Sequence, residues 1–395
     1  MKCFLGEVAE IILGGTPSTS NSEYWGGGIP WVSPGDINGF KYIKKTERTI
    51  TAAGLKNSNT KLLGKGEVII SARGSVGKIV QCIQPMAFNQ SCYAIRTKDC
   101  NVLVPEYIYY LLHHCVDYLR QNSAGAVFNA IIKTTLERTP ITLYPVEIQK
   151  RIASILSAYD DLIENNRRRI RLLEQAARLL YREWFVHLRF PGHEHVKINN
   201  GLPEGWEKKT AFDVMDVLSG GTPKTKIPAY WNGDIPFYTP KDATECAYVQ
   251  DTIKSLTEEG LRHCNSKLYP KNTIFITARG TVGKINLAQT SMAMNQSCYA
   301  LIAHPPVNQY FLYLSLADGV EQFRSRAVGA VFDAIIRDTF KLIPFIVPDD
   351  KIINLFTEQA KPVFQQIDIL STENRKLAQA RNLLLPRLMN GELTI

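Results

Sequence analysis

Two short glycine-rich segments hold the side chains of this sequence that are most able to bind an anion. Residues 72–78 read ARGSVGK and residues 278–284 read ARGTVGK. The glycines permit a tight turn, and the strands expected on either side would hold Arg and Lys outward on a short arm. Arg suits bidentate contact with guanine, Lys suits a phosphate, and Ser or Thr can serve either. The arms therefore predict DNA contacts at Arg73, Ser75, Lys78, Arg279, Thr281 and Lys284.

Simpler interpretations of these and neighbouring residues stay open. Each arm could be an ordinary hairpin in which Arg73 or Arg279 pairs with a local carboxylate. Asn89-Gln90 and Asn295-Gln296 could cap strands or read bases. The Tyr-Trp pairs at 24–25 and 230–231 are expected in the core, because burial is the usual fate of large aromatic side chains.

Known catalytic signatures are missing from the sequence. A phosphate-binding loop would need Gly in place of Ala72 and Ser or Thr in place of Ile79. The Pro-Pro pair at 305–306 is not part of the Asn/Asp-Pro-Pro-Tyr/Phe run of adenine methyltransferases. The histidine pairs at 113–114 and 193/195 lack further ligands at metal-site spacing. We therefore expect a chain that binds and positions, with no catalytic residue, metal or cofactor of its own.

The elements that position the arms occur twice, because a long N-terminal block recurs 206 residues later. Two units of about 200 residues are too long for solenoid repeats, so each should be a domain with its own core. Short strands and turns precede a helix, expected at 105–121 in the first copy and 307–325 in the second. Each half is thus mixed α and β. The matched blocks include GGTP at 14–17 and 220–223, NQSCYA at 89–94 and 295–300, and, at an offset of 204, GAVF at 125–128 and 329–332.

Between the matched blocks the two copies differ, which leaves a common scaffold with divergent surface segments. The clearest case is residues 40–62 compared with residues 246–268. Net charge differs as well, with +5 in residues 1–145 and +1 in residues 201–347. Lysines in the two halves add to the predicted DNA contacts, namely Lys41, Lys44, Lys224 and Lys241.

Each copy ends in a pattern typical of a long amphipathic helix. Apolar residues repeat at coiled-coil spacing from Ile152 to Trp184 and from Ile353 to Leu388, so the two helices should pair as an antiparallel coiled coil. Asn166 and Asn374 interrupt the apolar seams and either fix the register or point along its solvent edge. Pro362 should kink or interrupt the second helix. The run at Arg167–Arg169 is expected to be a solvated or partner-facing stripe.

Composition sets the class of protein. The chain has 395 residues, 45% of them apolar, a net charge of +9 and a pI near 9.0, which favours a polyanionic partner without proving one. Eight cysteines form no Cys-x-x-Cys pair and suggest reduced, mostly buried thiols of a cytosolic protein. Glu7 and Glu10 argue against a signal peptide, and no run of 18 apolar residues predicts a membrane span.

Taken in order and in two copies, these motifs resemble the specificity subunit of type I restriction-modification systems. The resemblance covers essentially the whole chain, including IENNR at 163–167, LYREWF at 180–185 and LLPRLMNGEL at 384–393. It implies two target recognition domains that each read half of a split DNA sequence, joined by helices that space them and hold two methylation subunits. It also implies restriction subunits that translocate DNA, with ATP, Mg and S-adenosylmethionine bound outside this chain.

The sequence therefore predicts an α+β protein with a pseudo-twofold internal repeat. Recognition domains are expected at residues 1–145 and 200–347, and spacer helices at 146–190 and 348–395. The expected role is that of a non-catalytic, cytoplasmic, DNA-binding specificity subunit. Two alternatives stay open: a DNA-binding regulator or architectural protein that acts alone, and an enzyme with an unrecognised site.

Overall fold

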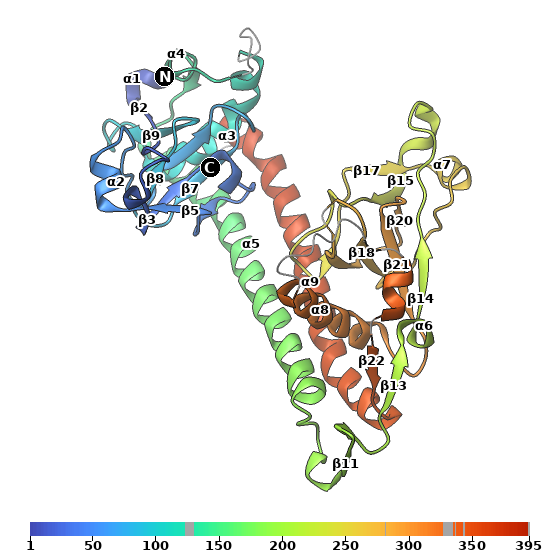
Figure 1. The fold of residues 1–395 in the computed structure, drawn as a ribbon. Coiled ribbons are helices and arrows are strands. Elements are labelled where there is room, and N and C mark those ends of the chain that lie inside the picture. The colour runs from blue at the N-terminus through green and yellow to red at the C-terminus, as the bar shows by residue number, and fades with distance from the viewer. Residues whose placement is uncertain (123–129, 281, 327–334, 336, 343, 394–395) are drawn as a thin grey trace. The chain divides into compact units, whose positions relative to one another are not determined.

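The computed structural model describes residues 1–122, 130–280, 282–326, 335, 337–342 and 344–393. Its contacts divide the chain into two compact units. The first unit comprises Met1–Ile163 and Lys376–Ile395, and the second comprises Glu164–Arg375. Each unit therefore combines the globular part of one repeat with a part of each long helix (Figure 1).

A mixed five-stranded sheet forms the centre of each unit. In the first unit the strand order is β2 (Ala9–Leu13), β9 (Cys92–Thr97), β6 (Val68–Ser71), β7 (Ile79–Cys82) and β4 (Tyr42–Ile43). In the second unit it is β14 (Met215–Ser219), β21 (Cys298–Ala303), β18 (Ile274–Thr277), β19 (Ile285–Ala288) and β16 (Tyr248–Val249). Ile11 pairs with Ile95 in the first sheet and Val217 pairs with Leu301 in the second, which is the same register shifted by 206 residues. The predicted duplication is confirmed at the level of strand pairing.

Smaller sheets repeat in the same way. Each unit has a three-stranded sheet and a two-stranded sheet that pairs an early strand with the strand leading into a long helix. In the first unit these are β5 (Arg48–Ile50), β3 (Trp25–Val32), β8 (Ala87–Phe88), and β1 (Lys2–Phe4) with β10 (Pro140–Thr142). In the second they are β17 (Lys254–Leu256), β15 (Trp231–Tyr238), β20 (Ala293–Met294), and β13 (Glu207–Thr210) with β22 (Pro344–Val347); β11 (Ile198–Asn199) and β12 (Leu202–Pro203) form a separate hairpin.

The core of the first unit lies on both faces of its five-stranded sheet. Val68 and Ile70 on β6 face a cluster that includes α3 (Pro105–Gln121), whereas Ile69 faces a second cluster with Phe88. All four residues of β6 are buried, which explains why its sequence is a short apolar run instead of an alternating pattern. The second unit repeats this arrangement with α8 (Gln309–Arg326) against β18.

Helices lie close to where the sequence predicts them. The expected helix at 105–121 coincides with α3, and the one expected at 307–325 differs from α8 by two residues at its start and one at its end. The long helices are α5 (Val146–Tyr181), extended by a turn at Arg182–Val186, and α9 (Asp350–Met389). The short helices are α1 (Leu5–Val8), α2 (Ala52–Lys56), α4 (Lys133–Glu137), α6 (Ala211–Val214) and α7 (Glu258–Arg262).

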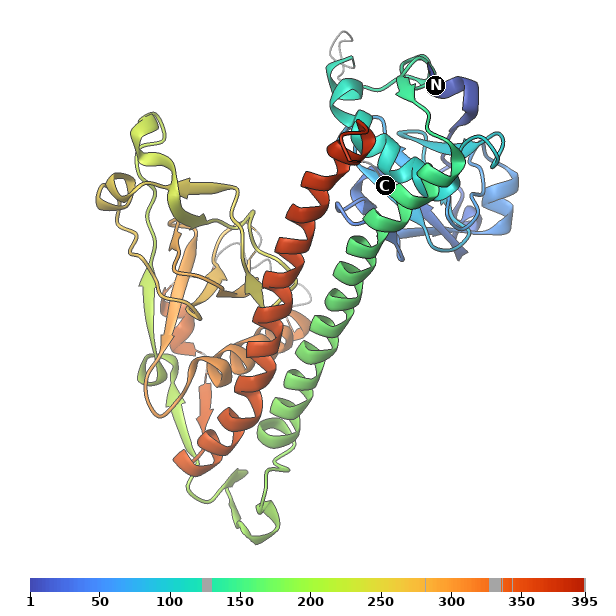
Figure 2. The same ribbon diagram turned by 180° about the vertical axis from the view of Figure 1, so that it is seen from behind.

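Within each unit, α5 and α9 contact each other in opposite chain directions (Figure 2). In the second unit Asn166 meets Glu373 and Trp184 meets Phe356. In the first unit Asp160 pairs with Arg381. Most of the predicted seam is buried or half-buried, but Leu162 is 46% exposed, so it is not part of the apolar contact.

Of the two effects expected of Pro362, a kink or an interruption of the second helix, the interruption does not occur. The helix α9 is continuous from Asp350 to Met389 and Pro362 lies on its exposed side. The carbonyl that loses its helical hydrogen bond there can be solvated by water, which lowers the cost of the proline. All eight cysteines are free thiols as expected, but only four of them are buried.

Candidate nucleic-acid interface

The two arms are tight turns between central strands. The first joins β6 to β7 and the second joins β18 to β19. Gly74 and Gly77 have φ of +76° and +79°, a region that other residues rarely adopt. The Ser71 hydroxyl at the base of the first arm donates to the Ser75 carbonyl and accepts from the Lys78 N–H at 2.9 Å. The first arm is thus held at its base by hydrogen bonds, and in the second arm the Lys284 N–H likewise donates to the Thr277 hydroxyl at 2.9 Å.

Arginine side chains stand at the tips of both arms. Arg73 and Arg279 are exposed, and in the described part of the chain neither has a carboxylate within ion-pairing distance. The alternative interpretation, in which each arginine pairs with a local carboxylate, therefore finds no support among these residues. Ser75 is also exposed, whereas Thr281 lies outside the described residues.

The arm lysines differ between the units. Lys78 and Lys284 occupy matching positions and both are partly buried. The Lys284 ammonium forms an ion pair with Glu245, a residue that the sequence interpretation did not single out. Lys78 has no carboxylate partner among the described residues. Sequence comparison could have found the difference, because Gly39 stands in the first copy where Glu245 stands in the second.

Motifs shared by the two copies converge beside each arm. The Ser91 carbonyl accepts from the Ala72 N–H at 2.8 Å, and the Thr16 hydroxyl donates to the Gln90 side chain. A β-carbon at Gly14 would lie 2.1 Å from the Asn89 carbonyl oxygen, so only glycine permits this close approach. The repeated GGTP and NQS blocks therefore act as a backbone scaffold that supports the arm.

Lys41 does not lie on the surface, contrary to its prediction as a DNA contact. It is only 7% exposed, and its ammonium donates to the Tyr110 hydroxyl at 3.1 Å. Tyr110 in turn donates to Asp160 at 2.6 Å, and Asp160 also pairs with Arg381. Burial lowers the pKa of Lys41, although the Asp160 carboxylate opposes that shift. This side chain joins β4 and α3 to the long helices instead of facing a ligand.

The other predicted lysines are exposed. Lys44 follows β4, Lys224 precedes β15, and Lys241 lies between β15 and β16. The Lys224 carbonyl accepts from the Trp231 indole at 3.4 Å, which ties this segment to the three-stranded sheet. All three remain candidates for phosphate contact.

The seam asparagines occupy different environments. Asn166 is 1% exposed and its amide donates to Glu373 at 3.4 Å, so it does not point along a solvent edge. Asn374 is half-buried, and its side-chain oxygen is enclosed without a hydrogen-bond partner in the described structure. The three arginines at 167–169 also differ in environment. Arg167 pairs with Glu164, whereas Arg168 and Arg169 are exposed.

A cation–aromatic pair recurs on both three-stranded sheets. The Arg48 guanidinium lies 3.4 Å from the centre of the Trp25 ring, and the Lys254 ammonium lies 5.1 Å from that of Trp231. Both tryptophans pack edge-on against a buried aromatic ring but are themselves half-buried. Of the two Tyr-Trp pairs expected in the core, only Tyr230 is buried. The cations were missed, although each lies 23 residues after its tryptophan in both copies.

Comparison with known proteins decides between the alternatives. The model of the type I restriction modification DNA specificity domain matches residues 1–175 and 203–379. The chain belongs to this family. The MjaIX specificity subunit of Methanocaldococcus jannaschii, a type I restriction enzyme subunit, is 29% identical over 98% of this chain and 92% of its own length. The HindI specificity subunit of Haemophilus influenzae is 24% identical over 76% of this chain and 81% of its own.

The fold agrees with this specificity family. A crystal structure of a type I restriction-modification S subunit from M. genitalium aligns with a TM-score of 0.57 at 16% identity, covering 98% of this chain and 96% of that one. The protein is therefore a DNA-binding, non-catalytic subunit with two recognition domains. The comparisons do not support a stand-alone regulator or an enzyme with an unrecognised site.

Two further features of the described residues bear on the site. No three His, Cys, Asp or Glu side chains in that part of the chain gather where they could hold a metal ion. No helix there combines the length and apolarity needed to cross a membrane.

Proposed function

We propose that the recognition domains, at about residues 1–145 and 200–347, each read one half of a bipartite DNA target in the cytoplasm. The observation that carries the proposal is the pair of exposed arginines, Arg73 and Arg279, on matching arms with no carboxylate partner among the described residues. An exposed guanidinium at the tip of a tight turn suits the two acceptors of guanine in the major groove. Ser75, Lys78 and the exposed lysines then supply backbone contacts.

A domain exchange tests whether each recognition domain reads its own half of the target. Residues 1–145 are replaced by the corresponding domain of a relative, and the target is selected from randomised DNA. One half of the target should change while the other half is kept. Change in both halves, or in neither, contradicts the modular assignment.

Single substitutions test the arms. Arg73→Ala should weaken recognition of one half-site and Arg279→Ala the other, each by about 1–3 kcal/mol if the contact is to a base. Binding is measured on duplexes that carry one intact and one scrambled half-site. Equal losses on both duplexes would show that the arginines do not read bases.

We also propose that α5 and α9 form the spacer and dock two methylation subunits, to which restriction subunits add. In support, the helices expose apolar side chains outside their mutual seam: Leu172, Leu179 and Leu383 are 54%, 64% and 71% exposed. Leu172 and Leu179 are seven residues apart and therefore share one helix face. Leu179→Ser should abolish co-purification of a methylation subunit without changing α-helix content by circular dichroism. Retained assembly would remove this face from the proposal.

Removal of one heptad from both helices tests the spacer. Each helix would shorten by roughly 10 Å. The variant, if folded, should lose the native target or prefer a shorter gap between half-sites. An unchanged gap in a selection over randomised spacers would show that the helices do not set it.

A further inference from the structure

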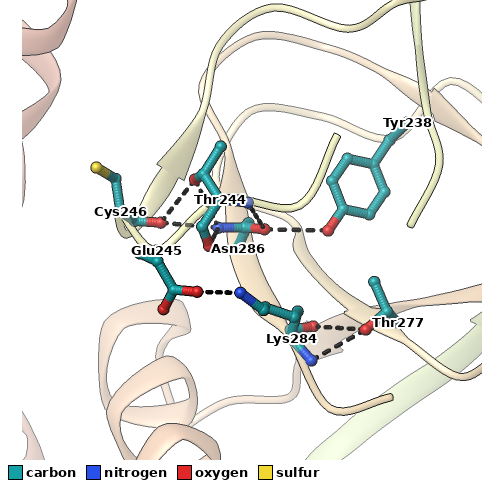
Figure 3. Close-up of polar contacts among 7 residues, drawn as sticks. All are labelled: Tyr238, Thr244, Glu245, Cys246, Thr277, Lys284 and Asn286. Carbon is teal, nitrogen blue, oxygen red and sulfur yellow. Dashed lines mark hydrogen bonds and ion pairs between the residues drawn. The ribbon is translucent and has the colours of Figure 1, made fainter. Parts of the chain in front are cut away.

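A loop of the second unit is fixed against the arm lysine by one buried amide (Figure 3). Asn286 on β19 is 0% exposed. Its NH2 group donates to the carbonyls of Thr244 at 3.1 Å and Cys246 at 2.7 Å. Its oxygen accepts from the Tyr238 hydroxyl at 3.0 Å and from the Thr244 N–H at 3.3 Å. The residues on both sides of Glu245 are thus tied to the central sheet.

Glu245 is consequently held beside the arm while remaining open to solvent. Its carboxylate pairs with Lys284, whose own N–H donates to the Thr277 hydroxyl at 2.9 Å. The Glu245 side chain is 87% exposed and the Lys284 side chain 25% exposed. One face of the carboxylate therefore meets the lysine and the other meets solvent, where a ligand could donate a hydrogen bond.

The first unit keeps the arm lysine, Lys78, and the hydrogen bond of its N–H to the Ser71 hydroxyl, but it lacks the amide and the carboxylate. Val80 stands at the position of Asn286, so the amide that binds the loop in the second unit is missing at this position. Gly39 stands at the position of Glu245, and Lys78 has no carboxylate partner among the described residues. The described glycines of the two arms nevertheless have matching backbone angles, because Gly280 has φ of +79° where Gly74 has +76°. The units share an arm and differ in what surrounds it.

Residues common to two recognition domains cannot by themselves make the domains prefer different half-sites. Discrimination must come from positions that differ, and Glu245 is such a position in direct contact with a shared arm residue. We infer that Glu245 is a specificity-determining residue of the second recognition domain. It neutralises Lys284 on non-matching DNA, and on the matching half-site it accepts a hydrogen bond from an exocyclic base amino group, such as cytosine N4. This inference rests on the proposed function.

The neutralisation of Lys284 by Glu245 predicts how the salt dependence of DNA binding changes when Glu245 is replaced. A lysine neutralised by a carboxylate releases no counterion when it approaches a phosphate, whereas a free lysine releases about one. Glu245→Gln should therefore steepen the slope of log affinity against log salt on random-sequence DNA by about 0.9. Between 50 and 200 mM salt this corresponds to an additional three- to fourfold loss of affinity, by roughly the same relation.

Matched variants of the full chain isolate the effect. Glu207→Gln removes a carboxylate that is ion-paired to Lys209 at 2.9 Å, on β13 in another sheet of the same unit, and should leave the slope unchanged. Glu245→Gln combined with Lys284→Gln should also lose the steepening, because the change acts through Lys284. An equal steepening in Glu207→Gln, or in the double variant, would overturn the inference.

Target selection from randomised duplexes tests the base contact. Glu245→Gln should relax the preference at one base pair in one half of the selected target and leave the other half intact. If the wild-type chain selects a bipartite target and Glu245→Gln selects the same one with the same salt slope, the inference is overturned and the proposed function stands. If the wild-type chain selects no sequence, the proposed function itself fails and the inference fails with it.

Discussion

In the first unit the globular domain meets the long helices through a buried chain of polar and charged side chains that begins at Lys41, whereas the domain side chains at the matching positions of the second unit are apolar or aromatic and its polar contacts with the helices, such as that of Gln289 with Asp368, lie at other positions. Lys41 and Tyr110 of the first unit correspond to Ala247 and Leu314 of the second. In place of the polar chain from Lys41 to Asp160, the second unit stacks Tyr310 on Phe364 with ring centres 4.7 Å apart.

The comparison shows that one scaffold accepts two kinds of joint. Hydrogen bonds and ion pairs between buried groups are directional, and they become costly when one partner is removed. Aromatic packing has no charge to leave uncompensated, and its strength does not depend on pH. The first joint should therefore be the more sensitive to mutation and acid.

The largest difference in loss of stability between the two units is expected when matched aspartates on the two long helices are replaced. Asp160 and Asp368 both lie six residues before a seam asparagine. Asp160→Asn removes the ion-pair partner of half-buried Arg381 and the carboxylate with the largest effect on the pKa of buried Lys41, and it should cost the first unit about 3–5 kcal/mol. Asp368→Asn breaks an ion pair with Lys271 that is partly open to solvent, whereas the hydrogen bond that Asp368 accepts from the buried Gln289 amide at 2.8 Å can be kept by the asparagine carbonyl. This change should therefore cost about 1 kcal/mol or less. Hydrogen exchange of α3 and α8 measures the two units separately; equal losses would contradict the comparison.

Acid should destabilise the first unit more than the second. Burial lowers the pKa of His113 on α3 to about 4, and Ala317 stands at the matching position of α8. Because the unfolded histidine takes up its proton near pH 6.5, stability is fully present above that pH and falls between pH 6.5 and 4, by up to about 3 kcal/mol. Exchange of α3 amides, corrected for intrinsic rates, should accelerate over this window. His113→Leu should flatten this pH dependence of α3 exchange. If the pH dependence is unchanged in that variant, groups other than His113 cause it.

A double-mutant cycle should reveal coupling inside the polar joint. Asp160→Asn should lower the free energy of unfolding less in a Lys41→Met background than in the wild type, because one buried charge no longer needs a counterion. We expect a coupling of about 1–2 kcal/mol between the two positions. The free energy of unfolding of the two single variants, the double variant and the wild type gives this term. Strict additivity would show that Tyr110 does not connect Lys41 to Asp160.

The smallest difference between the two units is expected in the contribution of the arm lysines to the salt dependence of DNA binding. Lys78→Gln should reduce the salt slope of binding to random-sequence DNA by about 0.9, because this lysine has no carboxylate partner among the described residues. Lys284→Gln should change the slope less, since Glu245 already neutralises that lysine. Fluorescence anisotropy at several salt concentrations measures both slopes. A larger change from Lys284→Gln would reverse the charge comparison.

Sequence patterns were sufficient to predict the duplication, the mixed α/β halves and the main helices. The 206-residue repeat is visible without coordinates, and helix periodicity is a local property, which is why α3 was placed at 105–121. The glycines of the arms were equally predictable, because a tight turn with positive φ depends on residues that are adjacent in sequence.

Only the tertiary structure decided which charged side chains face solvent. Lys41 and Lys44 look alike in sequence, but Lys41 is covered by α3 and bonded to a tyrosine 69 residues away. Lys284 meets a carboxylate 39 residues earlier, and Pro362 is tolerated because it lies on the exposed side of α9. Local patterns fix backbone geometry, whereas the burial and pairing of a charge depend on which distant segments pack against it, so these features had to come from the folded chain.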